Sequence, residues 1–332
     1  MSRFVTFGET MVQYNASYIG DFDESGEYIE DCAGAESNVA VNLNKLCVKN
    51  LETIWVSRLG NDDAADFILD ELRGRTTLEA TKNLDEKTGI SYLNHLKNGQ
   101  HVKTYRRKDS AASRLKFQDV KPHIEKATIV HVTGITPALS DTCKTTIEKV
   151  LEYTRKHKIP VSFDVNYREQ LWETETARTM FEYMLPFAWI FKVGHDEAEN
   201  VWQMGLSAKE YAKYFHNQNG GLVIITMADK GALVYDGNAI VEENGYEISV
   251  VDPVGAGDAF VAGFVGTIIA ENDETKSLKR RSSIHSNIIR KSLRVANVCG
   301  AVTCTKRGDT TAMPTSQEIN DFLTNQSSKS MN

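Results

Sequence analysis

The fold of this chain is decided by the stretch Val251-Asp252-Pro253-Val254-Gly255-Ala256-Gly257-Asp258-Ala259-Phe260. It follows the last expected strand and opens an apolar helix that we expect to run to about Ala270. Gly255 and Gly257 allow a tight turn and a close approach of the backbone to a ligand. The amides from Gly255 to Asp258 then lie at a helix N-terminus, where they have no intrahelical partner. Such amides favour an anion, above all a phosphate.

Asp258 is an unusual residue at such a turn, because a carboxylate repels a phosphate. One explanation is catalytic, in which Asp258 accepts the proton of a hydroxyl that attacks a phosphoryl group. The other is structural, since Asp often caps helices and glycines often form turns. For a bare G-x-G-D string, the structural explanation is favoured.

The rest of the chain predicts an α/β fold, because short β-branched and aromatic runs alternate with amphipathic stretches of helical length. The expected strands are Phe4–Phe7, Thr53–Ser57, Ile129–Val132, Val161–Asp164, Trp189–Val193 and Leu222–Thr226. The expected helices are Ser37–Leu46, Asp63–Arg73, Asp141–His157, Glu173–Pro186 and Asp196–Gln203. Further strands at Ala232–Tyr235, Ala239–Glu242 and Tyr246–Val250 predict an antiparallel edge. We therefore expect a doubly wound, mostly parallel sheet flanked by helices.

Two segments, at about residues 12–31 and 88–108, have strand-like character without a neighbouring helix. They could be edge hairpins of the main sheet. They could also pair with each other into a small second sheet that lies across the main sheet as a lid. Periodicity alone leaves both arrangements open.

Composition excludes several classes of protein. The chain has 38 Lys and Arg against 45 Asp and Glu, a net charge of −7, which argues against a nucleic-acid binder. Its five cysteines have neither the number nor the spacing of a disulfide framework or a zinc site. The longest apolar run, from Ala259 to Ala270, is shorter than the roughly 20 residues that span a bilayer. We expect a soluble cytoplasmic protein without a membrane partner.

The complete string Asp252–Phe260 matches D-x-x-G-A-G-D-x-F, and in it the chain resembles the PfkB (ribokinase-like) carbohydrate kinases. The resemblance continues at Gly8-Glu9, at the turn of residues 33–40 and at residues 58–62. It implies one ribokinase-like kinase domain over residues 1–332, with a small β-sheet lid over the sugar. It also implies that Asp258 is the catalytic base. Gly255, Ala256 and Gly257 would form the anion hole around the transferred phosphoryl group.

The resemblance further implies ATP and Mg²⁺ as cofactors. The motif T-x-G-x-x-G matches at Thr226 and Gly231, whereas Ala228 replaces its middle glycine. The nucleotide-binding candidates are Thr226, Gly231, Gly255, Gly257 and Asn297. The motif N-x-x-E keeps Glu197, a candidate to hold the metal directly or through water, but has Gly194 in place of Asn. Magnesium is also expected on physical grounds, because phosphoryl transfer from ATP needs neutralisation of the β and γ oxygens.

The acceptor is predicted from two arginine-containing strings, Tyr105–Ser113 and Asp164–Arg168, which look like those of 2-keto-3-deoxygluconate kinases. Arginine binds a carboxylate with two parallel hydrogen bonds, and this geometry suits a sugar acid. The expected substrate-binding residues are Gly34, Asn38, Tyr92, Tyr105, Arg107, Asn166, Arg168 and Asp258. Ala33 replaces a glycine that is common in the family, beside Gly34.

Alternatives stay open at this stage. Residues 106–108 could be a solvated charge run. If Arg107 and Arg168 point into solvent, fructose or ribose is the favoured acceptor. The departures at Ala33, Gly194 and Ala228 could mark a sugar-binding protein without turnover. Tyr92 and Tyr105 could pack in a dimer seam, since we expect a homo-oligomer that forms through the lid.

Overall fold

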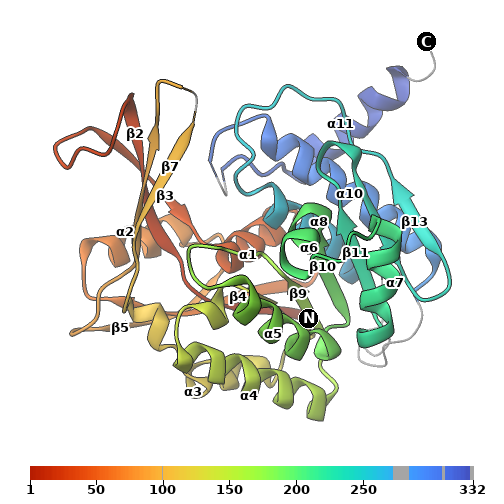
Figure 1. Cartoon of the computed structure of the whole chain (residues 1–332), viewed down its shortest axis with the longest axis horizontal. Coiled ribbons are helices and arrows are strands. Elements are labelled where there is room, and N and C mark those ends of the chain that lie inside the picture. The colour runs from red at the N-terminus through yellow and green to blue at the C-terminus, as the bar shows by residue number, and fades with distance from the viewer. Residues whose placement is uncertain (99, 272–283, 309–310, 330–332) are drawn as a thin grey trace.

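The large sheet of the computed structural model contains nine strands within the described residues, which are 1–98, 100–271, 284–308 and 311–329. Figure 1 shows the labelled elements. The strand order is β13 (Ile240–Glu243), β12 (Ala232–Tyr235), β11 (Leu222–Thr226), β10 (Ile190–Gly194), β9 (Val161–Asp164), β8 (Ile129–Thr133), β1 (Ser2–Phe7), β4 (Leu51–Gly60) and β5 (Thr77–Asn83). Neighbours from β11 to β5 are parallel, and β12 and β13 pair antiparallel at one edge. The predicted fold class is confirmed.

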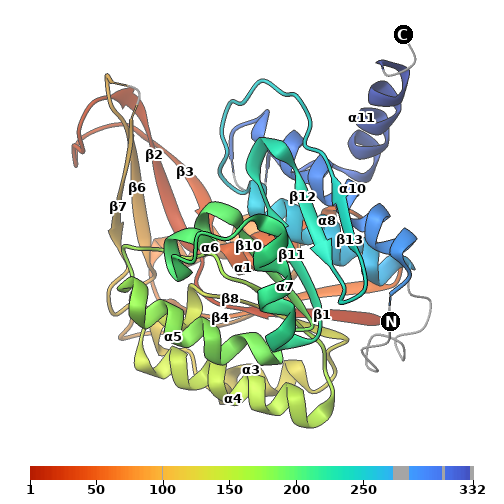
Figure 2. The ribbon, with the colours of Figure 1, turned by 45° about the vertical axis from the view of Figure 1, so that its right-hand side comes forward.

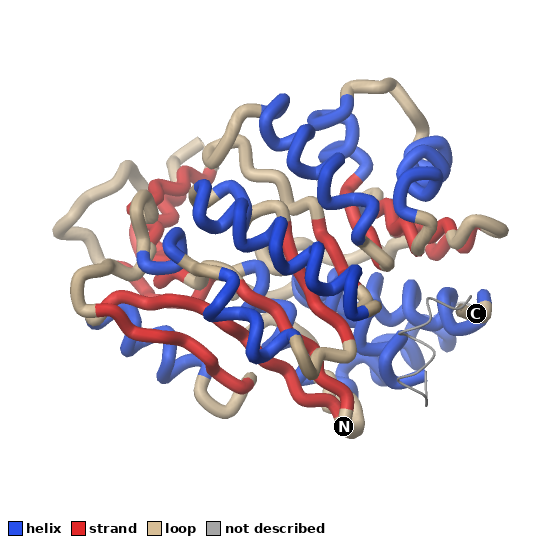
Figure 3. The backbone as a smooth tube through the Cα atoms, turned by 90° about the horizontal axis from the view of Figure 1, so that it is seen from below, coloured by secondary structure: helices blue, strands red, loops and turns tan. Residues whose placement is uncertain are grey.

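Helices cover both faces of this sheet, as Figure 3 shows. One hydrophobic cluster lies under α1 (Ala35–Lys45), α2 (Asp63–Leu72), α8 (Ala256–Glu271), α10 (Ser286–Cys304) and α11 (Ser316–Lys329). The other lies under α3 (Phe117–Ile124), α4 (Asp141–His157), α5 (Thr174–Met184), α6 (His195–Trp202) and α7 (Ala208–Asn219). Short 3₁₀ turns occur at Ala111–Arg114, Thr136–Ala138, Leu185–Phe187 and Ala228–Lys230. Successive strand residues point to opposite faces, so Phe4 joins the first cluster and Val5 the second.

A separate small sheet is formed by the two segments that lacked a helix. Its order is β3 (Tyr28–Ala33), β2 (Met11–Ile19), β6 (Ile90–His95) and β7 (His101–Arg106), with β2 and β6 parallel. Figure 2 shows it projecting from the large sheet. The two segments therefore pair with each other and are not edge hairpins of the main sheet.

The prediction of a strand at residues 246–250 is wrong. This segment is irregular, and its alternating apolar residues Tyr246, Ile248 and Val250 line a cavity where a strand would have paired. The chain then turns onto α10, because the amides of Val251 and Asp252 both donate to the carbonyl of Cys304. Among the described residues, no helix combines the length and apolarity that crossing a membrane requires.

Candidate active site

The site lies at the edge of the large sheet where its parallel strands end. Open α/β sheets bind ligands at this edge, because the loops after neighbouring strands meet there. A larger cavity of about 750 Å³ lies beside the ends of β10 and β11. A smaller cavity of about 350 Å³ lies between the loops that follow β8 and β9 and the end of β7.

The larger cavity brings together four of the five residues predicted to bind a nucleotide, and Gly255 is not among its lining residues. Thr226, Gly231 and Asn297 line it from β11, the start of β12 and α10. Ala228 also lines it and adopts a left-handed backbone with φ of 50°. This conformation costs an L-residue roughly 1–2 kcal/mol, which explains why glycine is the family's usual residue there. Ala228 therefore occupies the loop in a conformation that glycine would adopt at less cost.

Asn297 also has a structural role that its sequence position does not reveal. Its Nδ2 donates to the carbonyls of Glu243 and Asn244, at 3.0 and 3.1 Å. These bonds hold the segment that leads to Tyr246 against α10. Asn297 thus fixes one wall of the larger cavity.

The turn before α8 borders the larger cavity. Gly255 has φ of 77°, a left-handed conformation that favours glycine. Asp252 supports the turn, because its Oδ1 accepts a hydrogen bond from the Val254 amide at 3.0 Å. Ala256 and Gly257 open α8 and line the larger cavity. The helix N-terminus is therefore presented to this cavity, as an anion hole requires.

Asp258 is buried in the first turn of α8, with 8% of its surface exposed. Its Oδ2 accepts a hydrogen bond from Asn38 Nδ2 at 2.8 Å. Asn38 belongs to α1, which starts after Gly34. The structure thus joins the predicted base to the glycine turn that was predicted to bind the acceptor.

Lys192 is a functional candidate that the sequence reasoning missed. It lines the larger cavity, and its Nζ would lie 3.3 Å from a Cβ added at Gly257. It also donates to Asp164 Oδ2 at 2.9 Å. Burial lowers the pKa of Lys192, but the negative charges of Asp164, Glu197 and Asp258 outweigh this effect and raise it. A lysine within the otherwise buried strand β10 was the available signal.

Glu197 lies in the first turn of α6 and binds two backbone amides. Its Oε2 accepts from Gly194 at 3.1 Å, and its Oε1 accepts from Tyr167 at 2.5 Å. Its suggested contact with a metal stays a prediction.

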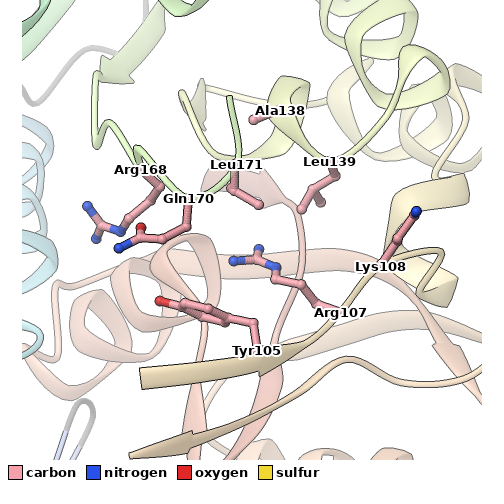
Figure 4. Close-up of a pocket in the computed structure, with 8 residues that line it drawn as sticks. All are labelled: Tyr105, Arg107, Lys108, Ala138, Leu139, Arg168, Gln170 and Leu171. Carbon is pink, nitrogen blue, oxygen red and sulfur yellow. The ribbon is translucent and has the colours of Figure 1, made fainter. Parts of the chain in front are cut away.

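Three of the residues predicted to bind the acceptor line the smaller cavity, namely Tyr105, Arg107 and Arg168. Figure 4 shows Arg168 and Gln170 on the loop after β9, on the opposite side of the cavity from Tyr105 and Arg107, with the exposed Arg168 guanidinium directed away from Arg107. The Arg107 guanidinium points into the space between them. The cavity is completed by Lys108, Ala138, Leu139 and Leu171. Three cationic side chains and one apolar wall suit a ligand with an anionic end and a carbon chain.

Arg107 is fixed by an ion pair. Its Nη2 lies 2.5 Å from Glu9 Oε2, with the two side chains 10% and 0% exposed. Ser110 Oγ donates to the other carboxylate oxygen of Glu9 at 2.5 Å. Neighbouring Arg106 is exposed and pairs with Glu24. Arg106 is therefore solvated, as a surface charge run predicts, whereas Arg107 is buried in an ion pair.

Glu9, like Lys192, escaped the sequence reasoning. It directly follows β1 and is buried, but its partner Arg107 comes from the distant end of β7. A second buried acid, Glu36, accepts hydrogen bonds from Thr133 and Thr136 through Oε1, at 2.6 and 2.7 Å. Burial raises the pKa of Glu36, and these hydroxyls and the charge of Arg107 oppose the rise only in part.

Tyr92 is not brought to the smaller cavity, which corrects its predicted role. Ser91 is opposite Tyr105 in the β6–β7 pairing, so Tyr92 points to the other face of the small sheet. There it stacks on Tyr14 with ring centroids 5.1 Å apart and packs against Phe22. Asn166 lies buried in the loop before Arg168.

The chain is similar to known sugar kinases. The model of the pfkB family of carbohydrate kinases matches residues 1–316. The 2-dehydro-3-deoxygluconokinase of Bacillus subtilis (strain 168) is 32% identical, over 97% of this chain and 95% of that protein. Probable fructokinase-3 of Arabidopsis thaliana is 26% identical, over 99% of this chain and 93% of that protein.

A solved structure shows the same fold. It is that of an E. coli protein designated Ribokinase II, in complex with ATP and Mg²⁺. The two chains superpose with a TM-score of 0.84 at 22% identity, over 98% of this chain and 100% of the other.

Proposed function

Because the chain belongs to the PfkB family of carbohydrate kinases, we propose that it phosphorylates the terminal hydroxyl of 2-keto-3-deoxygluconate, also called 2-dehydro-3-deoxygluconate. The product is 2-keto-3-deoxy-6-phosphogluconate. The family establishes the coarser statement, that the protein is a carbohydrate kinase transferring a phosphoryl group to an alcohol. Its cofactors are ATP and Mg²⁺.

The observation that supports a sugar acid is the pair of arginines at the smaller cavity. Arg107 reaches it from the end of β7, and Arg168 lines it from the loop after β9. The exposed Arg168 guanidinium extends away from Arg107 and donates to the Tyr167 carbonyl, so in this proposal it turns toward the cavity when the acid binds. A carboxylate is the group that a guanidinium binds with two parallel hydrogen bonds. Tyr105 supplies a hydroxyl beside them. The acid end of the substrate would bind here, with its terminal hydroxyl directed to Asp258.

In this proposal the acceptor hydroxyl lies beside Asp258, and the γ-phosphate of ATP lies at the start of α8. Asp258 takes the proton of the terminal hydroxyl as its oxygen attacks the γ-phosphorus of ATP, and the bond from phosphorus to the ADP oxygen breaks. Asn38 orients the carboxylate through the bond to Oδ2. The amides at the start of α8 and the Lys192 ammonium stabilise the charge on the transferring group. Closure of the small sheet as a lid would exclude water and limit hydrolysis of ATP.

The residues beside Lys192 fit a magnesium ion. Asp164 Oδ1 is buried and has no hydrogen-bond partner within the described part of the chain. Carboxylates are ligands that Mg²⁺ prefers, and it usually keeps several waters. Asp164 is the residue that would hold it, with Glu197 as a candidate through water. Bound with ATP, the ion neutralises the β and γ oxygens.

The experiment that tests this function is ATP-dependent turnover of the purified protein with Mg²⁺ on four acceptors. These are 2-keto-3-deoxygluconate, gluconate, fructose and ribose. Turnover confined to the keto-deoxy acid supports the proposal, and turnover of fructose or ribose alone refutes it. If no acceptor is used, the protein is a sugar-binding relative without turnover.

One observation favours fructose as a second candidate. Glu9 already compensates the charge of Arg107, so this arginine attracts an anion less than a free guanidinium would. The similarity to a plant fructokinase points the same way. Assembly of the protein through its lid stays a prediction in either case.

A further inference from the structure

Glu197 makes one contact that its position in a helix does not explain. As the third residue of α6 it caps its own helix by accepting from the Gly194 amide. This bond is local and common at helix starts. The bond from the Tyr167 amide to Oε1 is different, because it joins α6 to the loop after β9. A partly buried bond from a backbone amide to a carboxylate, made between a helix and a loop, fixes their relative position.

The loop that Glu197 holds contains a strained residue. Asn166 is buried and has φ of 42°, a left-handed conformation that costs most L-residues free energy. The amide that Glu197 binds belongs to the next residue, Tyr167. Arg168 follows directly and lines the smaller cavity. The direction in which the chain leaves Asn166 therefore decides where Arg168 lies.

The other end of this connection lies at the larger cavity. Gly194 ends β10, and Lys192 in the same strand lines that cavity and pairs with Asp164 at the end of β9. Val165 adds a backbone bond from its amide to the Lys192 carbonyl at 3.0 Å. Three contacts therefore join the ends of β9 and β10 and the segments that follow them: Lys192 with Asp164, Val165 with Lys192, and Tyr167 with Glu197. Of these three, only the contact with Glu197 involves a residue that follows Asn166.

We propose that Glu197 is a positioning residue for the acceptor, which sets Arg168 through the Tyr167 amide. This inference rests on the proposed function for the identity of the acceptor. In it, Glu197 acts on the binding of the sugar acid, and its contribution to Mg²⁺ is secondary. The N-x-x-E motif predicts instead that the main role of Glu197 is to hold the metal.

Two substitutions separate these roles. Glu197→Gln removes the charge and turns an amide nitrogen toward one of the two donors. Glu197→Asp keeps the charge but is one methylene shorter, so it cannot reach both Gly194 and Tyr167 in the same way. A positioning role predicts that both variants are impaired. A role as a negative charge near the metal predicts that Glu197→Asp is closer to the wild type.

The measurements are KM and kcat for 2-keto-3-deoxygluconate, the Mg²⁺ concentration at half-maximal rate, and amide hydrogen exchange of the segment 165–172. We expect both variants to raise KM for the acid about tenfold or more, because a charge-assisted bond is lost. Exchange of the segment should accelerate, and the Mg²⁺ midpoint should stay as in the wild type. Asp196→Asn is the matched control, since it removes the same charge from a fully exposed neighbour on α6.

Unchanged exchange in both variants would overturn the inference, as would a shifted Mg²⁺ midpoint with an unchanged KM for the acid. Failure of the proposed function gives a different result, in which the wild type itself does not use the acid. Hydrogen exchange then still decides whether Glu197 holds the loop, and KM for the acceptor actually used decides whether the loop matters for binding.

Discussion

The ion pair between Glu9 and Arg107 predicts a large and local effect on stability. Arg107→Met removes the cation and leaves the fully buried Glu9 carboxylate with the Ser110 hydroxyl as donor. The Glu9 side chain is 0% exposed, so the loss of the guanidinium leaves its charge poorly solvated. Removing one partner of a buried pair typically costs about 3–5 kcal/mol. We expect the free energy of unfolding to fall by about 3 kcal/mol or more.

Urea denaturation of the wild type, Arg107→Met, Glu9→Gln and the double variant measures this effect. The two changes should be strongly non-additive, with a coupling energy of about 1.5–3 kcal/mol, since each single variant leaves the other group unpaired. The matched control is the pair of Arg106 and Glu24, whose side chains are 49% and 76% exposed. There we expect no measurable coupling.

The reasoning is refuted if Arg107→Met is as stable as Arg106→Met, or if the changes at Glu9 and Arg107 are additive. The same variants carry a catalytic test. Arg107→Met should raise KM for the sugar acid far more than Arg106→Met does, because only Arg107 lines the smaller cavity. Equal KM values in the two variants would show that Arg107 serves the fold alone.

Three further predictions concern the buried ionisable groups. Asp258→Asn should lower kcat by about 10²–10⁴-fold with little change in calorimetric binding of the acceptor; near-normal turnover would exclude it as the base. Lys192→Met should lower kcat by about 10²-fold or more, measured with saturating ATP, and an unchanged kcat would contradict its role. Glu36→Gln keeps the bonds from Thr133 and Thr136 and removes a buried charge. Because burial raises the pKa of Glu36, the folded wild type loses stability as the pH rises from 4.5 toward the raised value. The unfolding midpoint of the variant, relative to that of the wild type, should therefore increase over this rise in pH. A difference that does not change with pH would contradict this.

The parts of the fold that local patterns determine were predictable. Strand residues such as Phe4 and Val5 point into opposite clusters, and this burial on both faces is what an uninterrupted apolar run indicates. The start of α8 was predictable for the same reason, because a turn and a helix N-terminus are specified within a few residues.

The remaining features depend on contacts between distant segments. Tyr92 was placed wrongly because the face of a strand residue depends on register, and a shift of one residue reverses it. Glu9 and Lys192 were missed because their partners come from other strands, which a linear pattern does not reveal. The segment 246–250 alternates like a strand but lines a cavity. In each case the position or conformation of the residue depends on tertiary packing, which local propensity does not encode.

The two halves of the site differ in how freely they could change during evolution. Asp258 is carried by α8, a helix buried on nearly all sides, where Gly263 packs so closely on α10 that an added Cβ would lie 2.8 Å from Cys299 Sγ. Almost any substitution along this helix would disturb the core, so the donor machinery is costly to alter. Arg168 lies on an exposed loop, and Tyr105 lies on a sheet that projects from the core. A lineage could therefore acquire a new acceptor through a few surface changes while its phosphate chemistry stayed constant.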